Sequence, residues 1–276
     1  MKKGIVLMII MALLVMPLAG CGSSNTDTES QKSEVFRVGL EAGYAPFNWT
    51  QTGDSNGAVK IDGAAEYAGG YDVEMAKKIA KGLGKELVIV KVEWDGLVPA
   101  LLSGKIDAIV AGMSPTEKRK ETIDFTDNYY KSDLVMIVKN GGKYEGATSI
   151  QDFEGAKITA QLNTFHYSVI DQIEGVVKEQ AMDNFPAMRV ALESGMIDGY
   201  ISERPEGVSA ETANENFKMI EFSDGFVTSE DDTAIAVGVK KGSELTKKIN
   251  EILKGISVEE QKSIMDDAVK NQPAVN

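Results

Sequence analysis

The sequence predicts an α/β fold, and three observations support this prediction. Apolar runs of strand length alternate with amphipathic stretches of helical spacing from residue 35 onward. The alternation restarts after Tyr129 and Tyr130, which indicates a second unit of the same kind. Hydrophobic residues make up 43% of the 276 positions, which is enough to bury a core, so a disordered or fibrous chain is excluded.

The first unit begins with a strand expected over residues 35–40, followed by a polar, glycine-rich surface loop or hairpin that runs to about Gly70. Asp72 is expected to cap the next helix, which ends at Gly84. The apolar positions of this helix are Val73, Ala76, Ile79, Ala80 and Leu83. Strands follow over 87–92 and 106–111, and Asp95 is expected to cap a helix over 95–103. This order is typical of a parallel sheet.

The second unit and the C-terminal part repeat the strand and helix pattern. Strands are expected over residues 134–138, 157–161, 197–202 and 234–239. Helices are expected near residues 166–173, 184–194, 243–253 and 258–269. Ser243 and Ser257 are placed to cap the last two helices.

Charge and the rarer side chains exclude several classes of protein. The chain has 29 Lys and Arg against 42 Asp and Glu, a net charge of −13, so nucleic acid is not an expected partner. Cys21 is the single cysteine and His166 the single histidine, so a thiolate metal cluster, a catalytic zinc site or a histidine triad is not expected. We predict no metal, no cofactor and no catalytic residue.

The N-terminus predicts export and a lipid anchor. Lys2 and Lys3 precede an apolar run over residues 4–16, which suits the hydrophobic region of a signal peptide. Leu18-Ala19-Gly20-Cys21 resembles the lipobox, where bacteria acylate the cysteine and cleave before it. The alternative is a stray cysteine after an ordinary signal peptide. We expect residues 1–20 to be a lipoprotein signal peptide and residues 21–33 a flexible tether, so that Cys21 anchors an extracytoplasmic body to the cell membrane.

Two segments predict an anion site. Residues 112–119 follow a strand and open a helix, which brings backbone amides, the Ser114 hydroxyl and the Arg119 guanidinium near one point. Ser114 with Glu117 three residues on is equally a capping box that needs no ligand. The segment 163–165 also precedes a helix, and its amides are expected to face the same anion.

Other candidate residues lie at predicted strand ends. Glu203 ends a strand, where ligands collect in open α/β sheets, although a surface ion pair is the alternative. Tyr44 and Trp94 are candidates for an aromatic wall, whereas Phe47 is expected in the core. No nucleophile accompanies His166 in the sequence, so we interpret it as a helix-start residue.

Several motifs together resemble a known family. They are Tyr44-Ala45-Pro46-Phe47, Gly70-Tyr71-Asp72-Val73-Glu74-Met75-Ala76, Trp94-Asp95-Gly96-Leu97, Gly104-Lys105-Ile106-Asp107-Ala108 and Asp124-Phe125-Thr126-Asp127. In this order they resemble the polar amino-acid-binding lipoproteins of ABC importers, the bacterial extracellular solute-binding proteins of family 3. The resemblance implies a two-lobe periplasmic-binding-protein-like fold of type II, with a central sheet flanked by helices in each lobe and two hinge strands. Lobe 1 would comprise 34–133 and 231–276, and lobe 2 would comprise 134–230.

The resemblance also implies roles for ten residues. Arg119 would bind the α-carboxylate of an amino acid, with help from Ser114 and from the amides of Thr164 and Phe165. Gly112 and Glu203 would hold the α-amino group, although the family more often has aspartate at the latter position. Tyr44 and Trp94 would enclose the ligand side chain, and Glu41 would select it with Gln161 nearby. An acid between aromatic rings favours a basic side chain, so arginine, lysine or ornithine is the leading expectation.

The implied function is capture of a free L-amino acid by hinge closure and delivery to an ABC permease and its ATPase in the membrane. We expect a monomer and no enzymatic activity. One alternative is a cyclohexadienyl dehydratase on the same fold, in which Glu203 would be the general acid for prephenate or arogenate. Another is a ligand-sensing receptor that signals through a separate protein. Asn163 before Thr164 departs from the usual Gly-Thr and puts the backbone geometry there in question.

Overall fold

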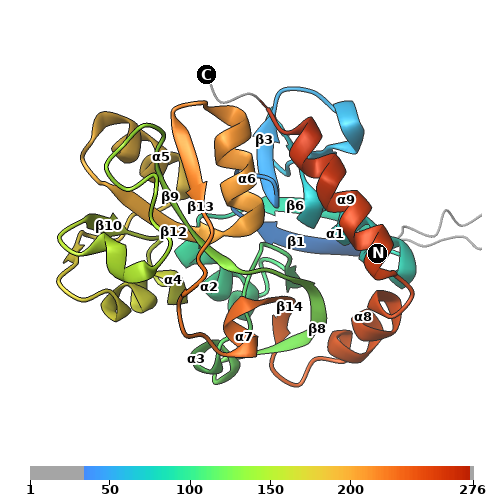
Figure 1. The fold of residues 1–276 in the computed structure, drawn as a ribbon. Helices are drawn as coiled ribbons and strands as arrows, with labels where there is room; N and C mark the ends of the chain where they lie inside the picture. The colour runs from blue at the N-terminus through green and yellow to red at the C-terminus, as the bar shows by residue number, and fades with distance from the viewer. Residues whose placement is uncertain (1–33, 274–276) are drawn as a thin grey trace, which may run out of the picture. The chain divides into compact units, whose positions relative to one another are not determined.

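The computed structural model describes residues 34–273, which form three β-sheets with helices packed around them (Figure 1). The predicted signal peptide, tether and lipidated Cys21 lie outside the described residues. Within residues 34–273 no helix has the length and apolar character needed to cross a membrane.

The first five-stranded sheet has the order β6-β1-β7-β14-β8. Its strands are β1 (Val35–Leu40), β6 (Glu86–Lys91), β7 (Ala108–Ile109), β8 (Ile123–Lys131) and β14 (Ala234–Lys240). Strand β1 runs parallel to β6 and β7, but β14 runs antiparallel to β7 and β8. The prediction of a parallel sheet is therefore confirmed for β1, β6 and β7 and wrong for one strand, β14, because the chain returns to this sheet from its C-terminal part in the opposite direction.

The second five-stranded sheet has the order β11-β10-β12-β9-β13 and is also mixed. Its strands are β9 (Leu134–Lys139), β10 (Lys157–Thr159), β11 (Val177–Lys178), β12 (Gly199–Glu203) and β13 (Phe217–Ile220). The helical segments around it are η3 (Ile150–Phe153), α4 (Phe165–Val169), η4 (Ile170–Gln172), α5 (Phe185–Ser194) and α6 (Arg204–Ala213). Figure 1 shows β10, α4 and α5 on the opposite side of the molecule from α8 and α9, whereas α6 lies beside α9.

The segment expected to be a surface loop or hairpin forms a small sheet of its own, with the order β2-β3-β5-β4. Its elements are β2 (Gly43–Tyr44), β3 (Asn48–Gln51), η1 (Ser55–Gly57), β4 (Val59–Lys60) and β5 (Tyr67–Gly69). All its pairings are antiparallel, so the segment is a hairpin extended by two further strands.

Four helix starts differ from the predictions. The first helix, α1 (Tyr71–Leu83), is preceded by Gly70 and has no side-chain cap, because the Asp72 carboxylate is buried among other partners. Asp95 does not cap α2 (Leu97–Ser103) but lies inside the short η2 (Trp94–Gly96). In α3 (Glu117–Lys120) the cap is Thr116, so the capping box of Ser114 is wrong.

Near the C-terminus, α8 (Leu245–Leu253) has no side-chain cap, because Glu244 and not Ser243 is its N-cap residue; the Ser243 hydroxyl accepts from the amide of Leu245, the first residue of the helix. The prediction for α9 (Val258–Asn271) is confirmed, since the Ser257 hydroxyl accepts from the amide of Glu260.

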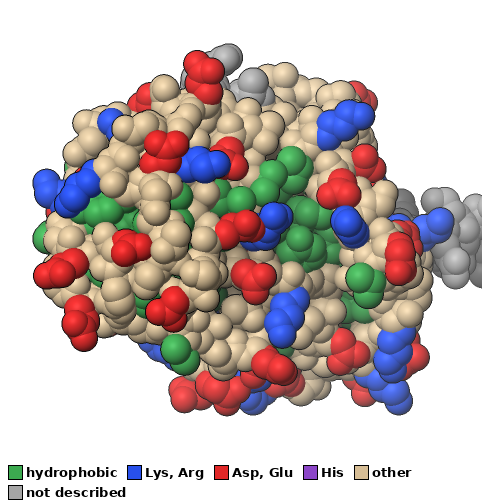
Figure 2. Space-filling model, in the orientation of Figure 1, with side chains coloured by type: hydrophobic (Ala, Val, Ile, Leu, Met, Phe, Trp, Pro, Cys, Tyr) green, Lys and Arg blue, Asp and Glu red, His purple; other side chains and the backbone are tan. Residues whose placement is uncertain are grey.

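Two neighbouring segments connect the two large sheets. The chain passes from β8 to β9 through Ser132 and Asp133, and it returns from β13 to β14 through α7 (Glu230–Thr233). The amide of Ser132 donates to the carbonyl of Thr233 at 3.0 Å, so the two passages lie side by side. Figure 2 shows acidic side chains along the edge of the molecule near α3 and α7.

Candidate functional site

The predicted site residues gather where strands of the two large sheets end. Glu41 follows β1, Trp94 follows β6, and Gly112 comes soon after β7. In the other sheet Gln161 follows β10, and Glu203 is the last residue of β12. The carboxyl ends of strands are the usual location of ligand sites in open α/β folds.

One small pocket brings these residues together. Its lining consists of Tyr44, Trp94, Gly112, Ser114, Arg119, Gln161, Thr164, Phe165, His166 and Glu203. The sequence predicted all of them except His166. Glu41, the remaining predicted residue, reaches the pocket through a hydrogen bond from Gln161 Nε2 to its Oε2 at 3.0 Å. The enclosed space is about 10 Å³, room for one water molecule.

Arg119 provides the positive charge of the pocket. Its guanidinium donates to the Ser114 carbonyl at 2.9 Å and to the Asn163 carbonyl at 3.1 Å, and it stacks on the Trp94 ring at 5.0 Å. Burial lowers the pKa of Arg119 to about 10, so the group remains a cation at neutral pH. The two bonds occupy two of its five N–H groups, so a rigid donor is available for a carboxylate.

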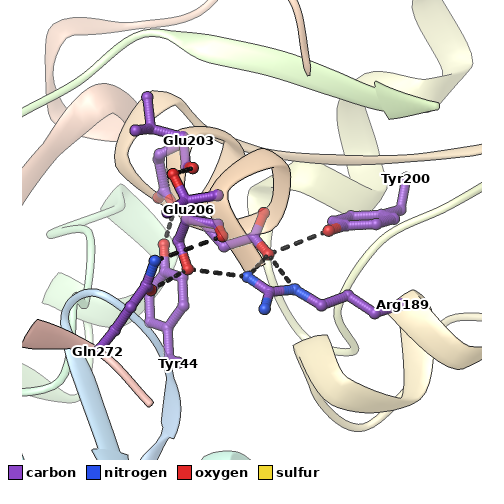
Figure 3. Close-up of polar contacts among 9 residues, drawn as sticks. Tyr44, Arg189, Tyr200, Glu203, Glu206 and Gln272 are labelled. Carbon is purple, nitrogen blue, oxygen red and sulfur yellow. Dashed lines mark hydrogen bonds and ion pairs between the residues drawn. The ribbon is translucent and has the colours of Figure 1, made fainter. Parts of the chain in front are cut away.

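Glu203 is the acidic group on the other side. It is 2% exposed, so a surface ion pair is excluded, and Arg204 pairs with Glu221 instead. The Tyr44 hydroxyl donates to Glu203 Oε2, as Figure 3 shows. Burial raises the pKa of Glu203 to about 8, so its carboxyl group is mostly protonated at neutral pH in this arrangement.

His166 is the pocket residue that the sequence interpretation missed. Its Nε2 lies 3.1 Å from Glu203 Oε1, yet neither ring nitrogen makes a hydrogen bond among the described residues. Burial, and then the charge of Arg119, lower its pKa to about 3, so the ring is neutral. The signal in the sequence was its position in the first turn of α4, next to two residues already assigned to the pocket.

Glu41 is a second buried acid with unused bonding capacity. Its Oε2 accepts from Gln161, but its Oε1 has no hydrogen-bond partner among the described residues. Burial raises the pKa of Glu41 to about 7. Leaving a buried carboxylate oxygen without a hydrogen bond costs folding free energy. A donor that enters the site would therefore gain by binding to Glu41 Oε1.

Asn163 resolves the question that its departure from Gly-Thr raised. Its φ is 55°, in the left-handed region where glycine and asparagine are favoured, so the turn before α4 keeps a glycine-like conformation. Its side chain donates to Asp95 Oδ1 at 2.9 Å. Together with its bond from Arg119, this contact links the α3 and η2 segments to the start of α4.

A larger hollow of about 620 Å³ adjoins the small pocket and shares four of its lining residues. The shared residues are Trp94, Arg119, Thr164 and Phe165. Arg119, Trp94, Thr164 and Phe165 therefore line both the small pocket and the larger hollow.

The comparisons with known proteins agree with this geometry. Residues 36–267 match the family described as bacterial extracellular solute-binding proteins, family 3. The chain belongs to this family. The family is one of substrate-binding proteins of transport systems, and it indicates a location outside the cytoplasm.

Individual members resemble the chain closely enough to compare. The arginine-binding extracellular protein ArtP of Bacillus subtilis is 30% identical over 271 residues, which cover 92% of each chain. The structure of AbpA of Streptococcus pneumoniae bound to L-arginine has a TM-score of 0.72 and 26% identity, covering 85% of this chain and 94% of the other. An ancestral arginine-binding protein bound to glutamine has a TM-score of 0.69 and 29% identity, covering 84% and 96%. The predicted type II periplasmic-binding fold is confirmed.

Proposed function

We propose that the protein captures a free L-amino acid and delivers it to the permease and ATPase of an ABC importer. The observation that carries the proposal is the pairing of a cation, Arg119, with a buried acid, Glu203, in one pocket formed by both large sheets. An amino acid carries a carboxylate and an ammonium group a few bonds apart. Each buried charge of the ligand then meets an opposite charge, as burial requires.

The favoured ligand is a basic amino acid, with arginine first. Glu41 supplies a buried acid with an unpartnered oxygen next to Gln161, and Trp94 and Tyr44 are aromatic residues of the pocket lining, where Arg119 lies against Trp94 and Phe185 stacks on Tyr44. ArtP and AbpA are named for arginine or bound to it, whereas the ancestral protein is bound to glutamine. Glutamine is therefore the competing ligand of neutral charge.

The proposed cycle is a hinge motion without chemistry on the ligand. Lobe 1 (34–133 and 231–276) and lobe 2 (134–230) separate, admit the amino acid and close again, and the closed form is presented to the permease. Cys21 carries the lipid that keeps this monomeric receptor at the outer surface of the cell membrane. The adjacent passages of chain at Ser132 and Thr233 suit a hinge, because they lie together.

The test is a thermal-shift screen of protein without residues 1–20, refolded to remove bound ligand, against all L-amino acids and ornithine. A ligand at a thousand times its dissociation constant adds about 4 kcal/mol, or about 8 to 16 °C for a chain of this size. We expect such a shift for arginine, with lysine or ornithine next. Arg119→Ala abolishes it, whereas Arg204→Ala, which removes an exposed arginine, leaves it.

The outcomes separate the alternatives. A rise in melting temperature with glutamine alone would support the proposed amino-acid receptor but would contradict the role of Glu41 in selecting a basic ligand. The protonated Glu203 is also what a dehydratase would need as a general acid, so prephenate belongs in the same screen. Conversion of prephenate to an absorbing product, with no shift from any amino acid, would replace the transport proposal.

A further inference from the structure

Two turns that contribute to the pocket have left-handed backbone. Ala42, between Glu41 and Tyr44, has a φ of 53°, and Gly112 has a φ of 61°. For alanine this conformation costs about 1 kcal/mol or more, so something must hold it. A Cβ at Gly112 would meet Cε1 of Tyr44 at 2.6 Å, so the two turns touch and must keep their relative position.

A chain of hydrogen bonds connects a backbone amide of each turn to the same carboxylate, that of Asp72. The amide of Ala42 donates to Asn48 Oδ1 at 2.8 Å, and Asn48 Nδ2 donates to Asp72 Oδ2 at 2.8 Å. The amide of Gly112 donates to the Tyr129 hydroxyl at 3.2 Å, which donates to Asp72 Oδ1 at 2.6 Å. Each carboxylate oxygen therefore accepts from one relay, and the Gly112 amide also acts directly on the Asp72 carboxylate.

The network is dry and directional. Asp72, Asn48 and Tyr129 are each 0% exposed, so water does not substitute for a lost partner. The amide of Ala42 needs Asn48 Oδ1 as its acceptor, so the Asn48 Nδ2 group must point toward Asp72. Asp72 Oδ2 must then be the acceptor of that hydrogen bond. The amide of Asp72 also donates to the Phe47 carbonyl at 2.8 Å, so α1 is tied to the chain just after the Tyr44 turn.

We propose that Asp72 is a positioning residue for the amino-acid site, which sets the geometry of the Glu41–Tyr44 turn and the Gly112 turn together through Asn48 and Tyr129. It touches no ligand. The inference rests on the proposed function for its ligand, but the two relays themselves are properties of the protein alone.

Two variants cut the network. Asp72→Leu has nearly the same shape but no acceptor oxygen, so it removes both relays and disturbs both turns. Tyr129→Phe removes only the hydroxyl that joins Gly112 to Asp72, and it serves as the milder variant if Asp72→Leu fails to fold. The matched control is Thr126→Val, since the Thr126 hydroxyl accepts from the buried amide of Val237 in the sheet that contains Tyr129 but bonds no residue of either turn.

The first measurement is hydrogen exchange of backbone amides by NMR without ligand. We expect Asp72→Leu to speed exchange at Ala42 and Gly112 by at least about tenfold, Tyr129→Phe to do so at Gly112 only, and Thr126→Val to do so at Val237 only. The second is the dissociation constant for arginine by calorimetry well below the melting temperature. The first two variants should weaken binding at least about tenfold, and the control less than twofold.

The proposal is overturned if exchange at Ala42 and Gly112 is unchanged, or if exchange rises while affinity stays within twofold of the unmodified protein. It is also overturned if Thr126→Val lowers the melting temperature as much as the Asp72 or Tyr129 variant does and weakens arginine binding by the same factor. Failure of the unmodified protein to bind any amino acid overturns the proposed function instead. The exchange rates then decide alone whether Asp72 holds the two turns.

Discussion

Three buried acids surround the pocket or support it, and all have raised pKa values. Burial raises the pKa to about 7 for Glu41 and Asp72 and to about 8 for Glu203. A neutral Glu203 suits the Tyr44 contact but not an ammonium ligand, which prefers the ionised acid. Binding of an amino acid at neutral pH should therefore release a proton.

The pKa of Glu203 predicts how stability without ligand depends on pH. Its folded value of about 8 lies above the ordinary 4.5, so its stabilisation is complete below pH 4.5 and is lost as the pH rises toward 8. Glu203→Gln cannot ionise. The free energy of unfolding of this variant, relative to that of the unmodified protein, should therefore increase from pH 5 to 8. Urea unfolding at several pH values measures this difference.

His166 provides the internal check on that experiment. Its folded pKa of about 3 lies below the ordinary 6.5, so its contribution is lost as the pH falls through this range, opposite in direction to Glu203. Because its ring lies 3.1 Å from Glu203 Oε1, the two proteins are also compared in a His166→Gln background, where this residue cannot titrate. A difference between the two proteins that stays flat from pH 5 to 8 would contradict a buried, protonated Glu203.

At the scale of single residues, the sequence predicted which residues line the pocket better than it predicted the hydrogen bonds that hold them. Arg119, Glu203 and Trp94 could be assigned because their motifs stand at strand ends. The Asp72 network could not be predicted, because it joins residues 24 and 57 positions apart through buried side chains. Asp72 at a helix start is also a typical cap, and only burial shows that it is not one.

Among the elements, α5 connects two parts of the fold: it is one of the helices around the second five-stranded sheet, yet it packs against the small sheet. The Phe185 ring stacks on Tyr44 at 4.4 Å with an angle of 7° between the planes. Both side chains are buried in one core that includes residues of both large sheets. This apolar contact holds α5 against β2 without any ligand.

Phe185→Leu should therefore shift the protein without ligand toward a more open form, because the shorter side chain loses the ring stacking. Small-angle X-ray scattering should show a larger radius of gyration without arginine and an unchanged one with it. Phe153→Leu is the control, since Phe153 is equally buried but lies in the separate core of the second sheet. An unchanged radius for Phe185→Leu would show that this contact does not hold the closed form.

Elements with strong periodicity were predicted well, as β1 and α9 show, while short elements were not. The small sheet contains strands of two to four residues, too short for an alternation pattern to reveal. The reversed direction of β14 was also hidden, since periodicity carries no information about strand direction.

At the scale of the whole molecule, a buried network joins α5, α6 and the end of the chain. Glu206 accepts from Arg189 at 2.8 Å and from Tyr200 at 3.0 Å, and Arg189 also donates to the Ser209 hydroxyl (Figure 3). Ser209 donates to Gln272, just past α9, and α9 packs on both α1 and α6. The C-terminus thus contacts both groups of helices, and a closing motion must accommodate or break that bond.

The size of the pocket has a consequence for kinetics. A space of about 10 Å³ cannot admit an amino acid, so this closed form must open before any ligand enters. In stopped-flow mixing, the fraction of protein in this form should bind at a rate that stops rising with ligand concentration and reaches a ceiling equal to its opening rate. Phe185→Leu should raise that ceiling, and a rate that stays proportional to concentration would show that the closed form is scarcely populated in solution.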